Sequence, residues 1–231
     1  MARFLKESEM TPPVAAWLRG QRLAVKREFT LPWGVCDLVA AGLSESRVEK
    51  RLELRQRRVI GPLSRVGLLL VLPDVESGRG VTLRKLCEMF EGFFSADEIG
   101  SELAVLEANR FVYRRGRGSF QKVNGWMPLH ERMIAVELKR ERVDEALCQA
   151  RRNKELTWES YVGLPTSVAE HVCNTRKRCN FESAGVGLLG VDSGAVKVLL
   201  EARRSGGVPD LAIEAYCVER FWRSRLEAVQ H

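Results

Sequence analysis

The stretch "MIAVELKRERVDEALCQARRN", Met133 to Asn153, carries the strongest structural signal in this chain. Its first part is an apolar run that ends in an acid and a base two residues apart. As a β-strand, it places every second residue from Ile134 to Leu138 on one face, and Glu137 and Lys139 on the other. Charges at the end of a buried strand cost desolvation free energy unless they are paired or hold an ion. We therefore expect either a salt bridge or a metal ion here.

The segments that follow this strand alternate between helix and strand. "ERVDEALCQARRNK" predicts a helix with an apolar face, and "SYVGLP" a further strand. "SVAEHVCNTRKR" predicts one helix, "GVGLLGVD" and "AVKVLLEARR" a hairpin, and "DLAIEAYCVERFWRSRLEAVQ" a closing helix. Alternating strands and helices with one hairpin predict an α/β fold with a mixed sheet.

The N-terminal part supplies a further helix and two further strands. "ESEMTPPVAAWLRGQ" predicts a helix that begins late because of its Pro-Pro pair, and "RLAVKREF" and "VCDLVAA" predict two strands around a Pro-Trp-Gly turn. Asp37 is the single charge in the second of these strands. A lone carboxylate among apolar neighbours needs a partner for the same reason that Glu137 does.

The middle of the chain, residues 46–126, has a different pattern. An arginine-rich segment and an apolar one predict two helical pieces around Gly61-Pro62, followed by helices in "VTLRKLCEMFEG" and "SADEIGSELAVLEANRFV". Ser95 and Glu98 form a capping box at the start of the last one. "FVYRRGRGSFQKVNGW" then predicts two short strands joined by a basic glycine turn. This order is that of a winged helix-turn-helix, whose third helix usually enters the DNA major groove.

Composition limits the classes of function. The 231 residues carry a net charge of +7, which favours a polyanionic partner such as nucleic acid. No apolar stretch is long enough to cross a membrane, and "MARFLKESEM" lacks the apolar core of a secretory signal. The six cysteines are scattered without a Cys-x-x-Cys pair, and His171, Cys173 and Cys179 lack a fourth zinc ligand at finger-like spacing. We therefore expect a cytoplasmic protein with buried, reduced cysteines and no zinc finger.

Four pieces of the sequence stand in an order that resembles the PD-(D/E)XK nuclease superfamily. They are "SEM" around Glu9, "GVCDLVA" at Asp37, "VELK" at Glu137 and Lys139, and "CQARRN" at Gln149. Within the superfamily, the sequence is similar to the Holliday-junction-resolvase-like and restriction-endonuclease-like members. The resemblance implies a restriction-endonuclease-like mixed sheet flanked by helices, formed by residues 1–45 and 127–231. Residues 46–126 would be an inserted winged-helix-like DNA-binding domain.

The resemblance also implies a metal site for phosphodiester hydrolysis. Asp37, Glu137 and the backbone carbonyl of Leu138 would bind Mg²⁺ or Mn²⁺, since hard divalent ions prefer oxygen ligands. Glu9 would hold a second ion or position the first. Glu7 competes with Glu9 for this role, and the greater distance from the helix-ending glycine favours Glu9.

Two further residues complete the implied catalytic set. Lys139 would orient or deprotonate the attacking water and steady the phosphate, and Gln149 would orient that water or Lys139. The alternative interpretation is a buried ion-pair cluster of Asp37, Glu137 and Lys139, with Glu9 and Gln149 as solvated surface residues. The ordered set as a whole favours the nuclease interpretation.

The basic turn of the middle segment is the candidate DNA-binding surface. Its cations have no acid between them and are interleaved with aromatic residues, and they are Arg110, Arg114, Arg115, Arg117 and Lys122. Arginine binds phosphates and guanine edges, which favours duplex DNA over an ordinary solvated face. Arg47 to Arg58 is a weaker candidate, because glutamates mixed into it are typical of an ion-paired helix.

The sequence therefore predicts a Mg²⁺- or Mn²⁺-dependent DNA endonuclease acting on duplex or branched DNA. By family resemblance it would work as a homodimer where two strands must be cut. The alternative is a non-catalytic DNA-binding or regulatory protein that uses the nuclease fold as a scaffold. A membrane partner is not expected.

Overall fold

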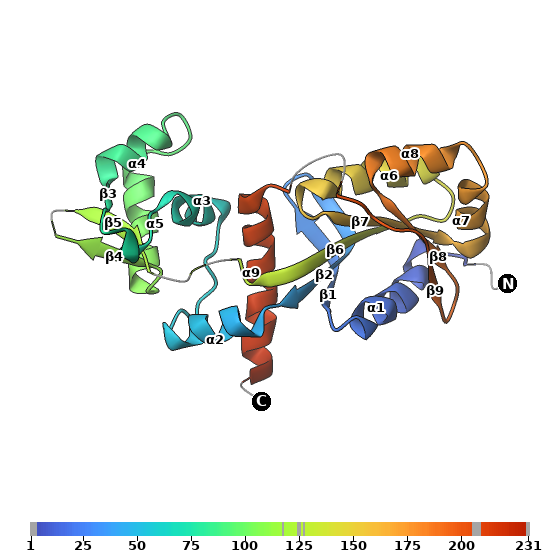
Figure 1. Cartoon of the computed structure of the whole chain (residues 1–231), viewed down its shortest axis with the longest axis horizontal. Helices are drawn as coiled ribbons and strands as arrows, with labels where there is room; N and C mark the ends of the chain where they lie inside the picture. Colours follow the sequence, from blue (N-terminus) through green and yellow to red (C-terminus); the bar gives the residue numbers. More distant parts are fainter. Residues whose placement is uncertain (1–3, 117, 124–125, 127, 205–208, 230–231) are drawn as a thin grey trace. The chain divides into compact units, whose positions relative to one another are not determined.

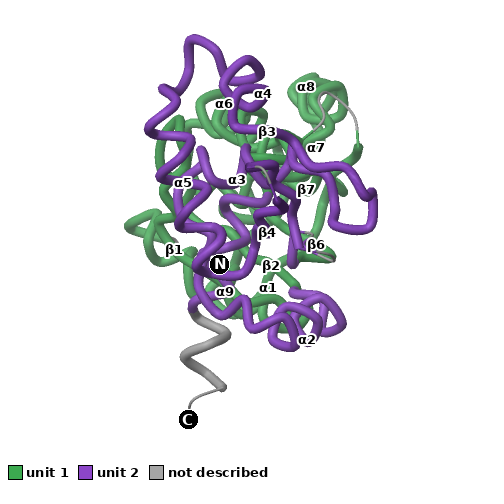
Figure 2. Tube along the Cα trace, turned by 90° about the vertical axis from the view of Figure 1, so that its left-hand side faces the viewer, with its two compact units in different colours: residues 1–42, 130–214 green, residues 43–129, 215–231 purple. Residues whose placement is uncertain are grey.

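The chain forms two compact units, each of which combines segments that are distant in the sequence. The computed structural model describes residues 4–116, 118–123, 126, 128–204 and 209–229. Unit 1 comprises Met1–Gly42 and His130–Glu214, and unit 2 comprises Leu43–Leu129 and Ala215–His231 (Figure 2). The sequence assigned residues 215–231 to the nuclease-like domain, whereas in the structure they are part of unit 2.

Unit 1 is built on a mixed six-stranded sheet with the order β1-β2-β6-β7-β8-β9 (Figure 1). β1 pairs with β2 and β8 with β9 in antiparallel fashion, while β6, β7 and β8 are parallel. The strands are β1 (Ala24–Leu31), β2 (Gly34–Leu43), β6 (His130–Leu138), β7 (Glu159–Pro165), β8 (Gly187–Val191) and β9 (Val196–Leu200). The mixed α/β sheet predicted from the alternation of strands and helices is therefore confirmed.

Helices cover both faces of this sheet (Figure 1). They are η1 (Glu7–Met10), α1 (Thr11–Gly20), α6 (Val143–Arg152), η3 (Asn153–Glu155), α7 (Thr166–Cys173) and α8 (Lys177–Ala184). Val14 and Leu18 of α1 pack on one face of the sheet, where Val136 is fully buried. Ala146 of α6 and Phe181 of α8 pack on the other face. The alternation that we expected in β6 therefore has a physical cause, since successive side chains meet different helices.

One prediction of a single helix was wrong. The sequence "SVAEHVCNTRKR" was expected to form one helix, but α7 ends at Cys173 and α8 begins at Lys177. The amide of Asn174 bonds to the carbonyls of Glu170 and His171, which closes the last turn of α7. The polar side chains of the intervening residues stay at the surface, so no apolar contact favours a continuous helix there.

Unit 2 contains a three-stranded sheet with the order β3-β5-β4. Its elements are α2 (Glu45–Glu53), α3 (Leu63–Val71), η2 (Val75–Ser77), β3 (Val81–Thr82), α4 (Leu83–Met89), α5 (Ala96–Ala108), β4 (Val112–Arg115) and β5 (Ser119–Lys122). The last helix, α9 (Leu211–Val229), belongs to unit 2 from Ala215 onward. The predicted capping box is confirmed, since Ser95 and Glu98 bond reciprocally at the start of α5. The short strand β3 was not anticipated.

A buried ion pair joins α2 and α9 inside unit 2. Arg51 donates to both carboxylate oxygens of Glu219, at 2.5 and 2.8 Å. Its guanidinium lies 4.5 Å from the ring centre of Trp222 and 5.0 Å from that of Phe111. The arginine-rich segment is thus an ion-paired helix at Arg51, although the partner is 168 residues away rather than on the same helix.

None of the helices among the described residues has the length and apolar run needed to cross a bilayer.

Candidate active site

Two strands of unit 1 bring the predicted acidic residues together. The backbone amide of Leu138 on β6 donates a hydrogen bond to Oδ2 of Asp37 on β2, at 2.7 Å, although the residues are 101 positions apart. Each strand has apolar neighbours around its acid, so both carboxylates are held at the sheet rather than in solvent. The sheet order β2-β6 therefore places Asp37 beside the Glu137-Leu138-Lys139 segment.

Glu137 is the more deeply buried of the two carboxylates. Its pKa is raised to about 7, because burial and the charge of Asp37 raise it by more than the hydrogen bond from Asn153 lowers it. Burial likewise raises the pKa of Asp37, while the amide of Leu138 and the ammonium of Lys139 lower it. Two adjacent carboxylates whose protonated forms are favoured make a site where a cation would be stabilised.

Asn153 holds Glu137 in place. Its Nδ2 donates to Oε1 of Glu137 at 2.6 Å, and its Oδ1 accepts from Nε1 of Trp33 at 3.2 Å. Asn153 is buried, and hydrogen bonds at both the nitrogen and the oxygen of its side-chain amide hold that group in one orientation. The sequence did not single out this residue, although it follows Gln149 by four positions, the spacing of one helix face.

Gln149 lies on α6, four residues before Asn153, which begins η3 directly after that helix. Its side chain is half-buried, and Oε1 is buried without a hydrogen-bond partner among the described residues. Glu145, four residues earlier, has Oε1 at 3.8 Å from Nζ of Lys139. Because Glu145 and Asn153 both contact the Glu137-Leu138-Lys139 segment, the stripe of α6 that carries Gln149 runs along the site.

Lys139 lies between two acids from different elements. Its ammonium is 3.8 Å from Oε2 of Glu7 on η1 and 3.8 Å from Oε1 of Glu145 on α6. Only 12% of its side chain is exposed, which leaves it a restricted range of positions. The carboxylate of Glu7 also accepts from the backbone amide of Arg140, at 3.4 Å.

Glu7, not Glu9, is the acid of the N-terminal segment that contacts the site. Glu9 is exposed, and its Oε2 accepts from the amide of Leu5 at 2.8 Å. The structure therefore does not bring Glu9 together with Asp37, Glu137 and Lys139. Glu7, the alternative acid, occupies the position that was expected for Glu9.

A cavity of about 220 Å³ opens beside Asp37 and contains a further acid that the sequence did not single out. It is lined by Glu7, Ser8, Thr11, Arg27, Glu28, Asp37 and Leu138. Glu28 lies opposite Asp37, but the pairing of β1 with β2 skips it, and its φ of 47° is in the left-handed region. A non-glycine residue with this backbone conformation is strained, and such strain concentrates at functional sites.

The residues present can hold a divalent cation of the Mg²⁺ type. No three His, Cys, Asp or Glu side chains in the described part of the chain are grouped so that they could hold a metal by themselves. Mg²⁺, however, is usually bound through one or two carboxylates and keeps several waters. The adjacent carboxylates of Asp37 and Glu137 match this donor set, and burial raises the pKa of each.

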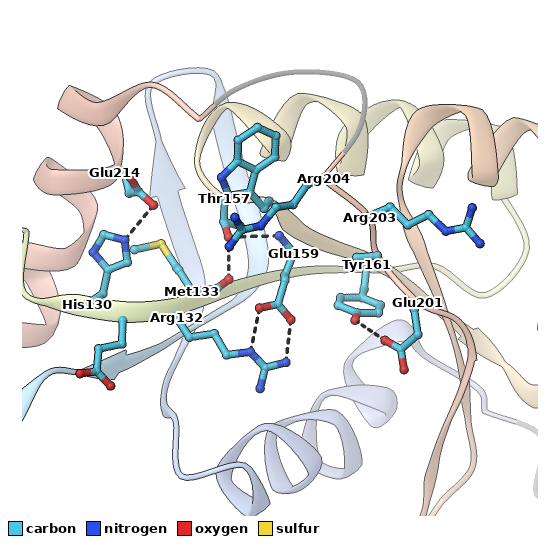
Figure 3. A pocket seen from close by; sticks show the side chains of 13 residues that line it. His130, Arg132, Met133, Thr157, Glu159, Tyr161, Glu201, Arg203, Arg204 and Glu214 are labelled. Atoms are coloured by element: carbon cyan, nitrogen blue, oxygen red, sulfur yellow. Dashed lines mark hydrogen bonds and ion pairs between the residues drawn. The ribbon is translucent and has the colours of Figure 1, made fainter.

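A second cavity of unit 1, about 280 Å³, lies where β6 and β7 begin (Figure 3). Arg132 binds Glu159 through two hydrogen bonds, at 2.7 and 2.6 Å, and Nε2 of His130 lies 2.7 Å from Oε1 of Glu214. Figure 3 marks these contacts with dashed lines, so Glu159 and Glu214 are already engaged by neighbouring side chains. This cavity is consequently a weaker candidate than the site at Asp37 and Glu137.

The predicted DNA-binding residues lie in unit 2 and are partly engaged. Arg114 is 3.3 Å from Glu107 and lies over the ring of Phe120, and Nη1 of Arg115 donates to the carbonyl of Gly78 at 2.5 Å. Arg110 is exposed at the end of α5, and Lys122 is half-buried on β5. Arg117 lies outside the described residues.

Comparison of the chain with protein-family models, with curated proteins and with solved structures finds no match. The geometry of the site therefore carries the functional argument.

Proposed function

We propose that unit 1 is a metal-dependent DNA endonuclease domain of the PD-(D/E)XK type, with a restriction-endonuclease-like sheet. The observation that carries the proposal is the 2.7 Å hydrogen bond from the amide of Leu138 to Asp37. It joins β2, which bears Asp37, to β6, which bears Glu137 and ends directly before Lys139, and this adjacency supports the proposal.

In this proposal Asp37, Glu137 and the carbonyl of Leu138 bind Mg²⁺ or Mn²⁺. When bound, such an ion polarises the phosphoryl oxygen and lowers the pKa of a coordinated water. Asn153 fixes the Glu137 carboxylate, which limits the reorganisation needed during the reaction. Lys139 donates hydrogen bonds toward the scissile phosphate or the attacking water, and Glu7 and Glu145 hold its ammonium near that position.

Gln149 has a supporting role in the proposed mechanism. Its buried, unpartnered Oε1 can accept a hydrogen bond from a water molecule on the stripe of α6 that runs along the site. Glu7 has the role that was predicted for Glu9, because its carboxylate contacts Lys139.

Unit 2 is proposed to bind DNA through its β4–β5 hairpin as a winged-helix domain. The order α3, β3, α4, α5, β4, β5 and the three-stranded sheet support this. Helix α5, in the position of the recognition helix, contains four acids and no Lys or Arg. Because phosphates repel acids, we do not expect α5 to enter the major groove, and Arg110, Arg114, Arg115, Arg117 and Lys122 would carry the contact.

Nicking of a supercoiled plasmid by the purified chain tests the catalytic proposal. We expect Mg²⁺- or Mn²⁺-dependent nicking that chelation stops. Asp37→Asn, Glu137→Gln and Lys139→Met should each remove it. The matched control Glu182→Gln, a half-buried acid on α8 that pairs with Arg178, should not. A chain that shifts DNA in a gel without divalent ions and never cuts it would instead be a non-catalytic DNA-binding or regulatory protein.

A further inference from the structure

A hollow of about 450 Å³ in unit 1 has an apolar floor and a polar rim that includes an arginine and a lysine. It is lined by Glu141, Val143, Val168, His171, Val172, Thr175, Arg176 and Lys177. Val143 and Val172 are buried in the core beneath it, and Val168 packs against that core from α7. The side chains of His171, Arg176 and Lys177 are exposed around it.

The hollow lies at the same edge of the sheet as the candidate active site. Val143 begins α6 four residues after Lys139, and α7 starts directly after the carboxyl end of β7. Ligands of α/β sheets bind at the carboxyl ends of the parallel strands. A molecule in this hollow would therefore extend the surface of the proposed catalytic site.

The cations of the rim can bind an anion. Lys177 is held 2.7 Å from Asp144, but both side chains are largely exposed, so this pair is weak and exchangeable. The side chain of Arg176 has no ion pair within the part of the chain that the structure describes. A single acid, Glu141, completes the rim and lies 4.0 Å from Arg140.

We propose that this hollow binds one unpaired nucleotide of a DNA strand that leaves the duplex next to the cleavage site. The inference rests on the proposed function of unit 1. A nucleobase has apolar faces that match the valine floor, and its phosphate matches Arg176 and Lys177. A base inside a duplex is stacked on both faces and cannot enter, so the occupied hollow selects DNA with a single-stranded arm.

Two DNA hairpins test the proposal, one blunt and one with a five-nucleotide single-stranded arm. Affinities of the full chain are measured by fluorescence anisotropy without divalent ions, so that no cleavage is needed. We expect the arm to tighten binding about tenfold, within the range of one stacked base and its phosphate. With 2-aminopurine at each arm position in turn, one position should change its emission on binding.

Two variants and a control assign the effect to the hollow. Arg176→Ala removes the arginine of the rim, and Val168→Trp fills the space above the floor. Each should abolish most of the tenfold preference while leaving affinity for the blunt hairpin unchanged. Arg178→Ala is the control, because Arg178 pairs with Glu182 on α8 and does not line the hollow.

Failure of this inference is distinguishable from failure of the nuclease proposal. The nucleotide site is overturned, even if plasmid is nicked, by any of three results. These are equal affinity for the two hairpins, no binding of either hairpin, or an equal loss of affinity for both hairpins in Arg176→Ala. A preserved arm preference with no cleavage under any metal condition supports the nucleotide site and removes the catalytic proposal.

Discussion

Asn153 donates its side-chain amide to Glu137 across 2.6 Å, in a buried position where its oxygen is already engaged by Trp33. This bond stabilises the ionised form of a carboxylate whose pKa burial raises to about 7. Asn153→Ala should therefore raise that pKa further, by about one to two units, since hydrogen bonds to charged groups contribute about 1.5–3 kcal/mol. Carbon-13 NMR titration of the Glu137 carboxyl in metal-free protein measures the shift.

Trp33→Phe is the matched control for this variant. It removes the hydrogen bond to Asn153 but leaves Asn153 in place, so we expect a smaller rise in the pKa of Glu137. An unchanged titration in Asn153→Ala would show that Asn153 has no influence on the charge of the site.

The pKa of Glu137 also predicts how stability depends on pH in the absence of metal ions. Because the folded-state pKa of about 7 exceeds the ordinary value of 4.5, the fold favours the protonated acid. The contribution of Glu137 to the free energy of unfolding is fully present below about pH 4.5. It is lost as pH rises from there through 7, by about 3 kcal/mol in total. Glu137→Gln should remove this loss and make metal-free protein more stable than wild type at pH 8.

Denaturant unfolding of unit 1 between pH 4.5 and 8 measures this effect. Mn²⁺ should restore the stability of wild-type protein at pH 8 and have little effect on Glu137→Gln, because a cation compensates the buried charge. Glu145→Gln is the control, because the side chain of Glu145 is 40% exposed while that of Glu137 is buried. Parallel pH profiles for wild type and Glu137→Gln would contradict the assignment.

Glu7 and Glu9 provide a direct test of the geometry of the N-terminal segment. Glu7 contacts Lys139 and the amide of Arg140, whereas Glu9 bonds to Leu5 at the surface. We expect Glu7→Gln to lower the nicking rate at least about tenfold, the cost of about 1.4 kcal/mol in the barrier. Glu9→Gln should stay within about threefold of wild type. The reverse order would restore Glu9 as the acid of the site.

The hairpin arginines should determine part of the salt dependence of DNA binding. Each phosphate contact contributes a log–log slope of about 0.9, so Arg114→Ala with Arg115→Ala should flatten it by about two units if both contact DNA. Arg114 must first leave Glu107, which reduces its net contribution to affinity. Anisotropy titrations at several salt concentrations measure the slope, and Arg19→Ala on α1 is the control. An unchanged slope would identify the hairpin as a solvated face.

The buried pair Arg51–Glu219 should be essential for the stability of unit 2. The side chains are 2% and 4% exposed, so Glu219→Gln leaves an uncompensated buried guanidinium and should cost about 3–5 kcal/mol. The double variant Arg51→Met, Glu219→Leu should recover most of this loss, because it removes both charges. Thermal unfolding followed by circular dichroism tests whether the double variant is more stable than Glu219→Gln. The exposed pair Lys50–Glu53 is the control.

Local patterns explain why much of the fold could be predicted. The alternation in "MIAVELK" indicates a strand with two different faces, and the Ser95–Glu98 capping box indicates the start of α5. Both patterns depend only on residues that are neighbours in the chain. The order of acids along the sequence also indicated that Asp37 and Glu137 belong together. The division of "SVAEHVCNTRKR" into α7 and α8 was missed, since its polar residues carry no periodic signal for a break.

The sequence by itself determined the α/β class of unit 1, the strand positions of Asp37 and Glu137, and the position of Lys139 at the end of the second strand. Only the tertiary structure decided that Glu7 rather than Glu9 contacts Lys139, because successive residues of a 3₁₀ turn point about 120° apart and the docking of that turn selects one. It likewise paired Asn153 with Glu137. Periodicity shows which face of an element is buried, but the partner that covers it comes from contacts between distant segments.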